Sequence, residues 1–391
     1  MTGTAGPATR AGDEDRLARA ALSRVGEPGT VALVAAVRRL GAAAVWSAVH
    51  AGEDPTADLP VTERLPATVL SGLAERARVA DPERDLDRAA VLGARLVVPG
   101  DPEWPERVDD LARLGTEPLS LWVRGPLQLG LATARAVAVV GSRAATAYGQ
   151  RVAGELGAEL ADRGWATLSG GAYGVDGCAH RGSLAAGGAT VAVLAGGVDV
   201  PYPRGHAALL ARIADEGAVV SEWPPGAAPA RHRFLTRNRV IAAMTAGTVV
   251  VEAAQRSGAR STAATAARLL RPCMAVPGPV TSATSAGCHA LLRQGATCVT
   301  GTEEVLEELG RPGEGLVDDT GARAGWRDAL GESARRVLEA LPVRGWAGPA
   351  QVARVAGVDQ LTVLRCLGPL EREGLVEGAA GRYRQSARAR R

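Results

Sequence analysis

The segment VAVVGSRAATAYG, residues 137–149, contains the transition that defines the fold class of this 391-residue chain. Its first four residues are all apolar, as in a strand buried on both faces of a parallel sheet. The strand ends at Gly141-Ser142-Arg143, and a helix is predicted to open near Tyr148. Such a turn directs backbone N–H groups and the positive end of a helix dipole to one place, which favours phosphate binding. Arg143 would add a bidentate donor.

The same kind of apolar run recurs along the chain, separated by segments long enough for crossover helices. The runs are AVAVV (136–140), ATLS (166–169), TVAVL (190–194), AVVS (218–221), TVVVE (248–252), CMAVP (273–277) and TCVT (297–300). Their alternation with helical segments predicts an α/β fold with a Rossmann-like, doubly wound, mostly parallel sheet. Two earlier runs, ARLVV and LSLWV within residues 91–125, are predicted to extend this sheet.

The flanking segments differ in character from this core. Residues 16–85 carry helical patterns joined by Gly-containing turns, typical of a sterile-alpha-motif or helix-hairpin-helix module. Such a module can grip DNA backbone or serve as a protein-contact or spacer unit, and the sequence leaves both open. The full division that we predict is a disordered N-terminus (1–15), the helical domain (16–85), the extended Rossmann-like domain (86–310), a linker (311–330), a winged helix of three helices and a hairpin (331–385) and a basic tail (386–391).

Composition limits the class of protein. All 45 basic residues are Arg and the net charge is only +3, so any electrostatic attraction must come from local clustering. Five scattered Cys without a C-x-x-C pair argue against a zinc site or a disulfide framework and suit a reducing, cytoplasmic compartment. The N-terminus has no signal-like apolar region and no stretch is long enough for a membrane helix. We therefore expect no metal, no cofactor and no membrane association.

A second Gly-rich loop, LSGGAYGVDGCAH at 168–180, also follows a predicted strand. Ser169-Gly170-Gly171 would let the backbone approach a ligand closely. Asp176 and His180 lie four residues apart and share a helix face, as an acid–base pair of a hydrolase would. No nucleophile or metal motif accompanies them in the sequence. We therefore favour the interpretation in which Asp176 orients the loop and His180 is hydrogen-bonded in the core.

The third motif, APARHRFLTRNRVIAAM at 228–244, places basic side chains around the only phenylalanine of the chain. Its candidate ligand-binding residues are Arg231, Arg233, Phe234, Arg237, Asn238 and Arg239. Arginines for phosphates beside an aromatic ring for a base are what single-stranded nucleic acid requires. The loops after parallel strands share one edge of the sheet, so Arg143 and Arg239 are expected to hold phosphates and Phe234 to stack on a base. In the competing account Phe234 is a core residue.

These blocks, in this order, resemble the DNA-processing protein A family, also called DprA or Smf. The resemblance covers about Arg95 to Leu309 and rests on GSR (141–143), SGGAYGVD (169–176) followed by AHRG, YP (202–203), SEWPPG (221–226), FLTRNRVI (234–241), VVEA (250–253), SGARST (257–262), PGP (277–279) and GCH (287–289). Two features depart from the family pattern. His289 stands where relatives commonly have Asn, and positions that are Lys in many relatives must be Arg or lost here.

The resemblance implies that residues 86–310 bind single-stranded DNA and that the protein loads RecA recombinase onto it in natural transformation and recombination. It implies site roles for Gly141, Ser142, Arg143, Ser169, Gly170, Phe234, Arg237, Asn238 and Arg239, to which the residue patterns add Gly171, Arg231 and Arg233. It also implies a Rossmann-like core with a helical N-terminal domain and a C-terminal winged helix. We expect a homodimer that is not an enzyme.

Three alternatives stay open at this stage. A phosphoribohydrolase-like enzyme would carry P-G-G-x-G-T and a following acid, whereas this chain has Pro277-Gly278-Pro279. A nucleotide sensor would use the winged helix on duplex promoters, and a structural adaptor would not use the crevice at all. Neither G-x-G-x-x-G nor a P-loop is present, so the sequence does not favour NAD or ATP.

Overall fold

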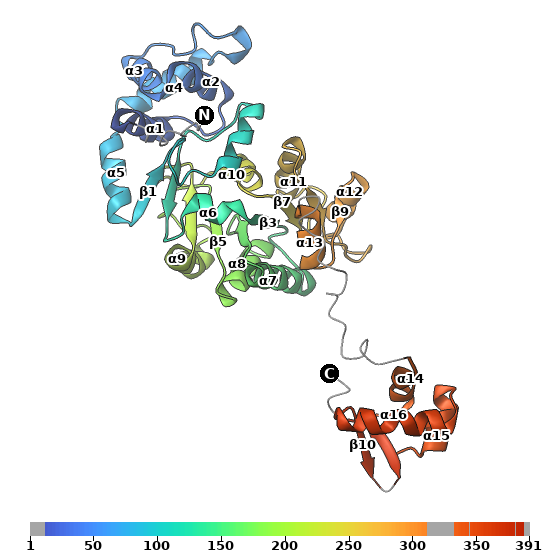
Figure 1. The fold of residues 1–391 in the computed structure, drawn as a ribbon. Coiled ribbons are helices and arrows are strands. Elements are labelled where there is room, and N and C mark those ends of the chain that lie inside the picture. Colours follow the sequence, from blue (N-terminus) through green and yellow to red (C-terminus); the bar gives the residue numbers. More distant parts are fainter. Residues whose placement is uncertain (1–11, 311–331, 344, 380, 387–391) are drawn as a thin grey trace, which may run out of the picture. The chain divides into compact units, whose positions relative to one another are not determined.

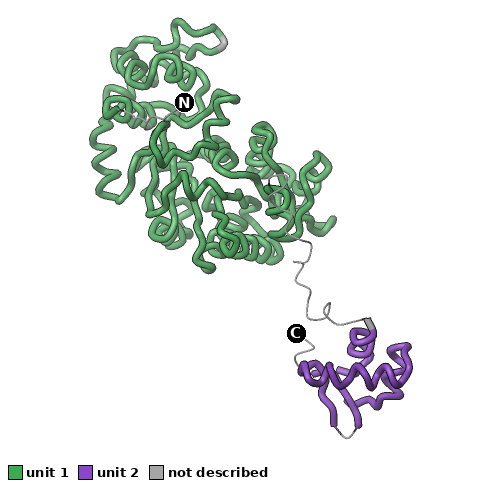
Figure 2. The backbone as a smooth tube through the Cα atoms, viewed as in Figure 1, with its two compact units in different colours: residues 1–310 green, residues 311–391 purple. Residues whose placement is uncertain are grey.

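The computed structural model describes residues 12–310, 332–343, 345–379 and 381–386. The chain forms two compact units, residues 1–310 and residues 311–391 (Figure 2). The predicted linker and most of the predicted basic tail lie outside the described residues.

The first unit is built on a nine-stranded sheet, which confirms the predicted fold class (Figure 1). The strands are β1 (Ala94–Val97), β2 (Leu121–Arg124), β3 (Ala136–Val140), β4 (Ala166–Ser169), β5 (Thr190–Val193), β6 (Ala218–Ser221), β7 (Gly247–Val250), β8 (Cys273–Ala275) and β9 (Thr297–Cys298). Their order in the sheet is β1-β2-β6-β5-β4-β3-β7-β8-β9. Strands β3 to β9 pair in parallel, whereas β2 pairs antiparallel with β6 and β1 antiparallel with β2, so these two strands extend the sheet.

Helices cover both faces of the sheet. These are α6 (Leu129–Ala134), α7 (Ala147–Asp162), α8 (Val175–Ala185), α9 (Ala207–Glu216), α10 (Arg231–Ala243), α11 (Ala259–Arg268), α12 (Ala286–Arg293) and α13 (Thr302–Leu309), with 3₁₀ segments at Glu106–Leu114 and Arg204–His206. Alternate residues of β3 enter different cores: Val137 and Val139 pack with α7 and α8, and Ala138 packs with α10 and α11. Each strand is apolar on both faces because each face has its own layer of helices.

Between residue 12 and the sheet the structure describes five helices: α1 (Asp13–Val25), α2 (Val31–Leu40), α3 (Ala42–Ala51), α4 (Ala67–Ala77) and α5 (Pro82–Val91), with a 3₁₀ turn at Val61–Glu63. Helix α1 begins within the segment that was expected to be disordered up to residue 15. Asp13, Glu14 and Asp15 form its first turn, where acidic side chains favour the helix dipole. The expected boundary at residue 85 also falls inside α5.

In the described part of the chain, no single helix is long and apolar enough to cross a membrane. Helices α2 and α3 taken together have the length and apolar composition of a membrane span, but the chain bends sharply between them. Their apolar side chains, among them Leu33, Val37, Val45 and Val49, are buried in a core shared with α1 and α4.

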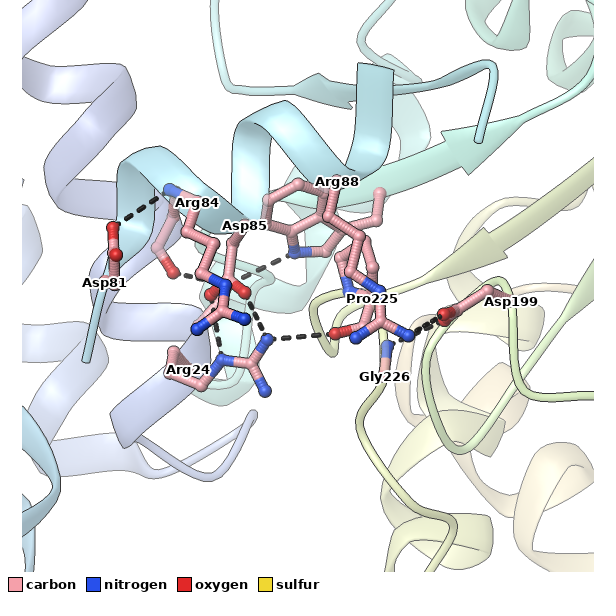
Figure 3. A network of polar contacts seen from close by, with 11 residues as sticks. Arg24, Asp81, Arg84, Asp85, Arg88, Asp199, Pro225 and Gly226 are labelled. Atoms are coloured by element: carbon pink, nitrogen blue, oxygen red, sulfur yellow. Dashed lines mark hydrogen bonds and ion pairs between the residues drawn. The ribbon is translucent and has the colours of Figure 1, made fainter. Parts of the chain in front are cut away.

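Polar contacts fasten these N-terminal helices to the sheet domain (Figure 3). Arg24 of α1 donates to Asp85 of α5 at 2.8 Å and to the carbonyl oxygen of Pro225 at 2.9 Å. Arg88 of α5 donates to Asp199 at 2.6 Å, and Asp199 also accepts from the N–H of Gly226 at 2.7 Å. Helices α1 and α5 are thereby bound to the loops that follow β5 and β6.

The second unit contains α14 (Glu332–Ala340), α15 (Pro349–Ala356) and α16 (Gln360–Arg372), followed by the antiparallel hairpin of β10 (Val376–Ala379) and β11 (Arg382–Gln385). The three helices share a buried core with the start of β10. These elements follow the predicted order, and their assignment as a winged helix stays a prediction.

Glycines allow α7 and α8 to cross at very short range. A Cβ atom on Gly157 of α7 would lie 2.2 Å from the carbonyl oxygen of Ala179, and one on Gly182 of α8 would lie 2.0 Å from the carbonyl oxygen of Gly154. These obstacles are backbone atoms, which cannot rotate away as a side chain can. The crossing therefore requires glycine at residues 157 and 182.

We predict that Gly157→Ala destabilises the first unit, because the added methyl group must separate two packed helices at a cost of about 1–3 kcal/mol. Gly154→Ala in the same helix is the matched control, since its Cβ atom would meet its nearest neighbour at 3.9 Å. That control should be neutral or stabilising because alanine favours a helix by about 1 kcal/mol over glycine. Chemical denaturation of both variants tests this, and equal stabilities would contradict it.

Candidate nucleic-acid interface

The parallel sheet changes its winding direction between β3 and β7. These strands are neighbours, but the chain leaves β3 toward β4 on one side and leaves β7 toward β8 on the other. The loops that follow the two strands therefore run in opposite directions, and they leave a crevice at the carboxyl ends of the strands. A cleft of about 680 Å³ lies here. It is lined by Val140, Gly141, Ser142, Arg143, Ala172, Asp176, Tyr202, Pro229, Arg231, Phe234, Leu235, Arg237, Asn238, Ile241, Ala254, Arg256, Ser257, Gly258, Ala259 and Thr262.

The N-terminus of α7 is closed by a carboxylate of the protein itself. Glu252, directly beyond β7, accepts from the N–H of Thr146 at 2.8 Å and from its hydroxyl at 2.7 Å. Only 2% of Glu252 is exposed. The phosphate that was expected at this helix N-terminus therefore has no place there, because Glu252 already supplies the negative charge. The sequence alone could not show this, since Glu252 lies 106 residues from Thr146.

The Gly141-Ser142-Arg143 turn still borders the cleft, but its backbone serves the fold. The N–H of Ser142 donates to the carbonyl oxygen of Glu252 at 2.6 Å, and Ser142 accepts through its own carbonyl from Val175 at 3.2 Å. A Cβ atom on Gly141 would lie 2.5 Å from the Val175 side chain. Glycine is needed so that the two strand ends and α8 can meet, and the exposed Arg143 is left to face the cleft.

Arg143, Phe234 and Tyr202 form a cluster in the wall of the cleft. The guanidinium carbon of Arg143 lies 5.1 Å from the ring centroid of Phe234, and the ring centroids of Tyr202 and Phe234 lie 5.2 Å apart. Phe234 is half-buried and Tyr202 is 44% exposed. The structure therefore places Phe234 in the cleft wall and not in the core. Tyr202 belongs to the YP pair (202–203) of the family resemblance, and its proximity to Phe234 could not be inferred from the sequence.

Arg237 lies buried beneath the cleft. Its Nη1 donates to the carbonyl oxygen of Gly170 at 2.9 Å and also to that of Val193, so it ties α10 to the ends of β4 and β5. Burial lowers the pKa of Arg237 to about 10, although the nearby Asp176 opposes that shift. Arg237 is one of the residues that line the cleft. Its Nη1, however, is already hydrogen-bonded to the two carbonyl oxygens.

Arg239 is placed differently from the sequence-based expectation. Both terminal nitrogens of its guanidinium pair with the carboxylate of Glu222 at 2.7 Å, and only 8% of Arg239 is exposed. Residues two apart in a helix point about 200° apart, so Arg239 lies away from the cleft that Arg237 lines. The expected phosphate contact is therefore not supported, and Arg239 forms a core ion pair instead.

The remaining predicted residues divide in the same way. Ser169 is fully buried and donates to the carbonyl oxygen of Val139 at 2.6 Å. Arg233 pairs with Glu27. Of the predicted set, the cleft gathers Gly141, Ser142, Arg143, Arg231, Phe234, Arg237 and Asn238, whereas Ser169, Gly170, Gly171, Arg233 and Arg239 are not among its lining residues. Arg256, in the loop after β7, also lines the cleft, although it was not among the predicted site residues.

Asp176 and His180 have the structural roles that we favoured. Asp176 accepts from the N–H groups of Gly170 at 3.1 Å and Ala172 at 3.3 Å, and burial raises its pKa against the opposing effect of Arg237. His180 is fully buried, and its Nδ1 lies 2.8 Å from the hydroxyl of Thr190. That hydroxyl donates to the carbonyl oxygen of Thr167, so the imidazole Nδ1–H is the donor to Thr190.

The cleft concentrates positive charge in a chain that is nearly neutral. Arg143, Arg231, Arg237 and Arg256 line it, and among its described lining residues Asp176 is the one carboxylate. Clefts lined by one sign of charge attract ligands of the opposite sign. The fold and the cleft thus define an α/β protein whose switch-point crevice suits an anionic ligand that carries flat rings.

Comparison with known proteins agrees with this class and specifies the family. Residues 95–310 match the family model of the DNA recombination-mediator protein A, and the chain belongs to that family. The putative DNA processing protein DprA of Mycobacterium tuberculosis H37Rv is 48% identical over 380 residues, which cover 95% of each chain. DprA of Streptococcus pneumoniae is 37% identical over 200 residues, covering 51% of this chain and 70% of the relative. The X-ray structure of DprA from Streptococcus pneumoniae matches with a TM-score of 0.62 at 26% identity, covering 76% of this chain and 98% of that one.

His180 predicts a dependence of stability on pH. Burial, with smaller effects from His206, Arg237 and Arg181, lowers the pKa of His180 from 6.5 to about 3. As pH falls below 6.5 the unfolded chain binds a proton that the folded chain does not, so stability should fall by up to about 1.4 kcal/mol per pH unit. Denaturation at several pH values should show a smaller decline for His180→Gln than for the wild type. His50→Gln, on the exposed surface of α3, is the control, and equal slopes for all three proteins would contradict the assignment.

Proposed function

We propose that this protein binds single-stranded DNA in the switch-point cleft without base specificity and loads RecA recombinase onto it during natural transformation and recombination. The observation that carries the DNA-binding part is the cluster of Arg143, Phe234 and Tyr202 in an arginine-lined cleft. The RecA step and a homodimer are inferred from the family resemblance and a cytoplasmic location from the scattered cysteines, and all three are part of the proposal.

The preference for single strands follows from the aromatic wall. A base can stack on Phe234 only if its own flat face is free, which favours unpaired bases over a duplex. The ring face already holds the guanidinium of Arg143 at 5.1 Å, so it accepts a flat, polarisable group. Arg143, Arg231 and Arg256 would then neutralise the phosphates on either side.

The contacts of Asn238 support the absence of base specificity. Asparagine can read a base edge through a bidentate contact of its side-chain amide with adenine. Its amide nitrogen donates to the carbonyl oxygen of Gly258 at 3.1 Å, and its amide oxygen accepts from Arg237 at 3.2 Å. Both groups are therefore engaged within the protein, and Asn238 holds α10 to the loop after β7.

We infer that the cleft acts by binding and not by catalysis. Asp176, the carboxylate that lines it, is held by two backbone N–H groups beneath the surface. His180 is fully buried and hydrogen-bonded to Thr190, so it cannot reach a ligand in the cleft. A phosphoribohydrolase needs an acid or base at the substrate, and neither residue supports that alternative.

We predict that Arg143→Ala and Phe234→Ala weaken binding in different ways. Loss of Arg143 should lower affinity and flatten the log–log salt slope by about 0.7, the contribution of one phosphate on a single strand. Loss of Phe234 should cost about 1–3 kcal/mol of stacking and leave the salt slope unchanged. Fluorescence anisotropy with single-stranded and duplex oligonucleotides at several salt concentrations measures both.

Arg151→Ala is the matched control for Arg143→Ala, because Arg151 pairs with Glu155 on the exposed surface of α7. It should bind as the wild type does. Tighter binding to duplex than to single strands would overturn the proposal. A large fall in melting temperature of Phe234→Ala with normal binding by the folded fraction would show instead that Phe234 stabilises the core.

The C-terminal unit is predicted to be dispensable for this binding. Helix α16 carries Arg365 and Arg372 against Glu371 and the capping residues Asp359 and Glu373, and helices that read DNA are usually more basic. The first unit has its own core and includes the whole cleft. A chain that ends at Gly310 should therefore retain most of its affinity for single strands, which the same anisotropy titration measures. A large loss would assign the second unit a direct role.

A further inference from the structure

Helix α10 has two functional sides. Arg231 and Phe234, both in its first turn, line the DNA cleft. His232 and Arg233, also in that turn, meet the loop between α1 and α2 of the N-terminal helical region. Helix α10, which carries these proposed DNA-binding residues, is therefore also in contact with the α1–α2 loop, which does not line the cleft.

The N-terminus of α10 lacks the usual stabilising groups. Its N-cap residue is Ala230, whose side chain cannot accept a hydrogen bond from the first turn. Within the described first turn there is no acidic residue, and two arginines and a histidine occupy it instead. Positive side chains at the positive end of a helix dipole are unfavourable, and a missing cap leaves orphan N–H groups. The turn that carries Arg231 and Phe234 therefore lacks the stabilisation that a cap and an acidic first turn would provide.

Glu27 supplies the missing carboxylate from a distance. Its Oε1 lies 2.5 Å from Nη2 of Arg233, and its Oε2 lies 3.4 Å from both Nε2 of His232 and Nε1 of Trp223. The guanidinium of Arg233 also lies over the Trp223 ring at 5.2 Å and donates to the carbonyl oxygen of Ala228 at 3.0 Å. The guanidinium of Arg233 thus contacts Glu27, the Trp223 ring and the carbonyl of Ala228.

A second contact of the same loop fixes its position. Gly29 has a φ of +77°, and a Cβ atom there would lie 3.0 Å from Nε of Arg239. Gly29 therefore lies directly against the buried ion pair of Arg239 and Glu222. One turn before Glu27, Arg24 is bound to Asp85 and to the carbonyl of Pro225 (Figure 3). Glu27 projects from a loop that is anchored on both sides.

We propose that Glu27 is a positioning residue for DNA binding: it holds the first turn of α10 so that Arg231 and Phe234 face the cleft. Glu27 itself does not line the cleft. This inference rests on the proposed function for its consequence, and it gives the N-terminal helical region a role in DNA binding that requires no contact with DNA.

The negative charge of Glu27 allows a clear test, because electrostatics alone and the positioning role predict opposite changes in DNA affinity when Glu27 is removed. Removal of a negative charge near a cationic cleft should strengthen the binding of a polyanion. Loss of a positioning contact should weaken it. We expect Glu27→Ala in the full chain to bind a labelled oligothymidylate roughly fivefold more weakly, with a salt slope no steeper than that of the wild type because the phosphate contact of Arg231 is weakened and none is gained.

Two variants separate positioning from general damage. Ala230→Ser in the Glu27→Ala background restores a cap within α10, since serine accepts from the first-turn N–H groups. It should recover most of the lost affinity. Arg16→Ala breaks the ion pair of Arg16 with Asp101, which joins α1 to the loop after β1 without touching α10. That control should lower stability slightly and leave the affinity of the folded protein unchanged.

Hydrogen exchange without DNA reads the positioning step by itself. Amides of residues 231–235 should exchange faster in Glu27→Ala and slow down again when Ala230→Ser is added. Exchange and affinity equal to those of the wild type, tighter binding, or a defect that Ala230→Ser does not rescue would each overturn the inference. A wild type that fails to bind oligothymidylate would instead overturn the proposed function, and the exchange rates would still decide whether Glu27 holds the turn.

Discussion

The carboxylate of Glu252 occupies the N-terminus of α7, and the character of the cleft depends on this contact. In many sheets of this kind, the first helix N-terminus holds the phosphate of a nucleotide. Here Glu252 takes that position and also accepts from the hydroxyl of Thr284 at 3.1 Å, so it joins β7, the start of α7 and the segment before α12. An anionic ligand must therefore be held by arginine side chains on the surrounding loops and on α10.

Helix α10 shows how a chain without lysine uses arginine for two purposes. Arg237 spans two backbone carbonyls, and Arg239 makes a two-pronged pair with Glu222. The pair of Arg239 uses the planar fork of a guanidinium, which an ammonium group does not have, whereas Arg237 binds both carbonyls through its Nη1 alone. Buried arginines fix the helix against the sheet, while Arg231 on the same helix stays exposed at the cleft. Residue type alone does not separate these roles.

The sequence was sufficient for the architecture because buried parallel strands leave an apolar signature on both faces. Every predicted run of the parallel sheet corresponds to a strand, although several strands end sooner, as at Val250 where the run continues to Glu252. Part of the site could also be inferred, since loops after such strands converge. The assignment of Arg239 failed because it required knowledge of which helix face meets the sheet. The spacing of Arg237 and Arg239 shows that they cannot share a helix face. It does not show which of the two side chains faces the cleft. Contacts such as that of Glu27 with Arg233, 206 residues away, leave no local pattern to read.

The guanidinium of Arg143 above Phe234 has a consequence for how a ligand enters. This cation lies over the ring at 5.1 Å from its centroid. A base that stacks on that face must displace it, and the displaced arginine is then free to meet the phosphate that arrives with the base. Entry is in this sense an exchange reaction, in which one partner of the ring replaces another. In the proposed site, Arg143 would cover the ring of Phe234 until a base replaces it.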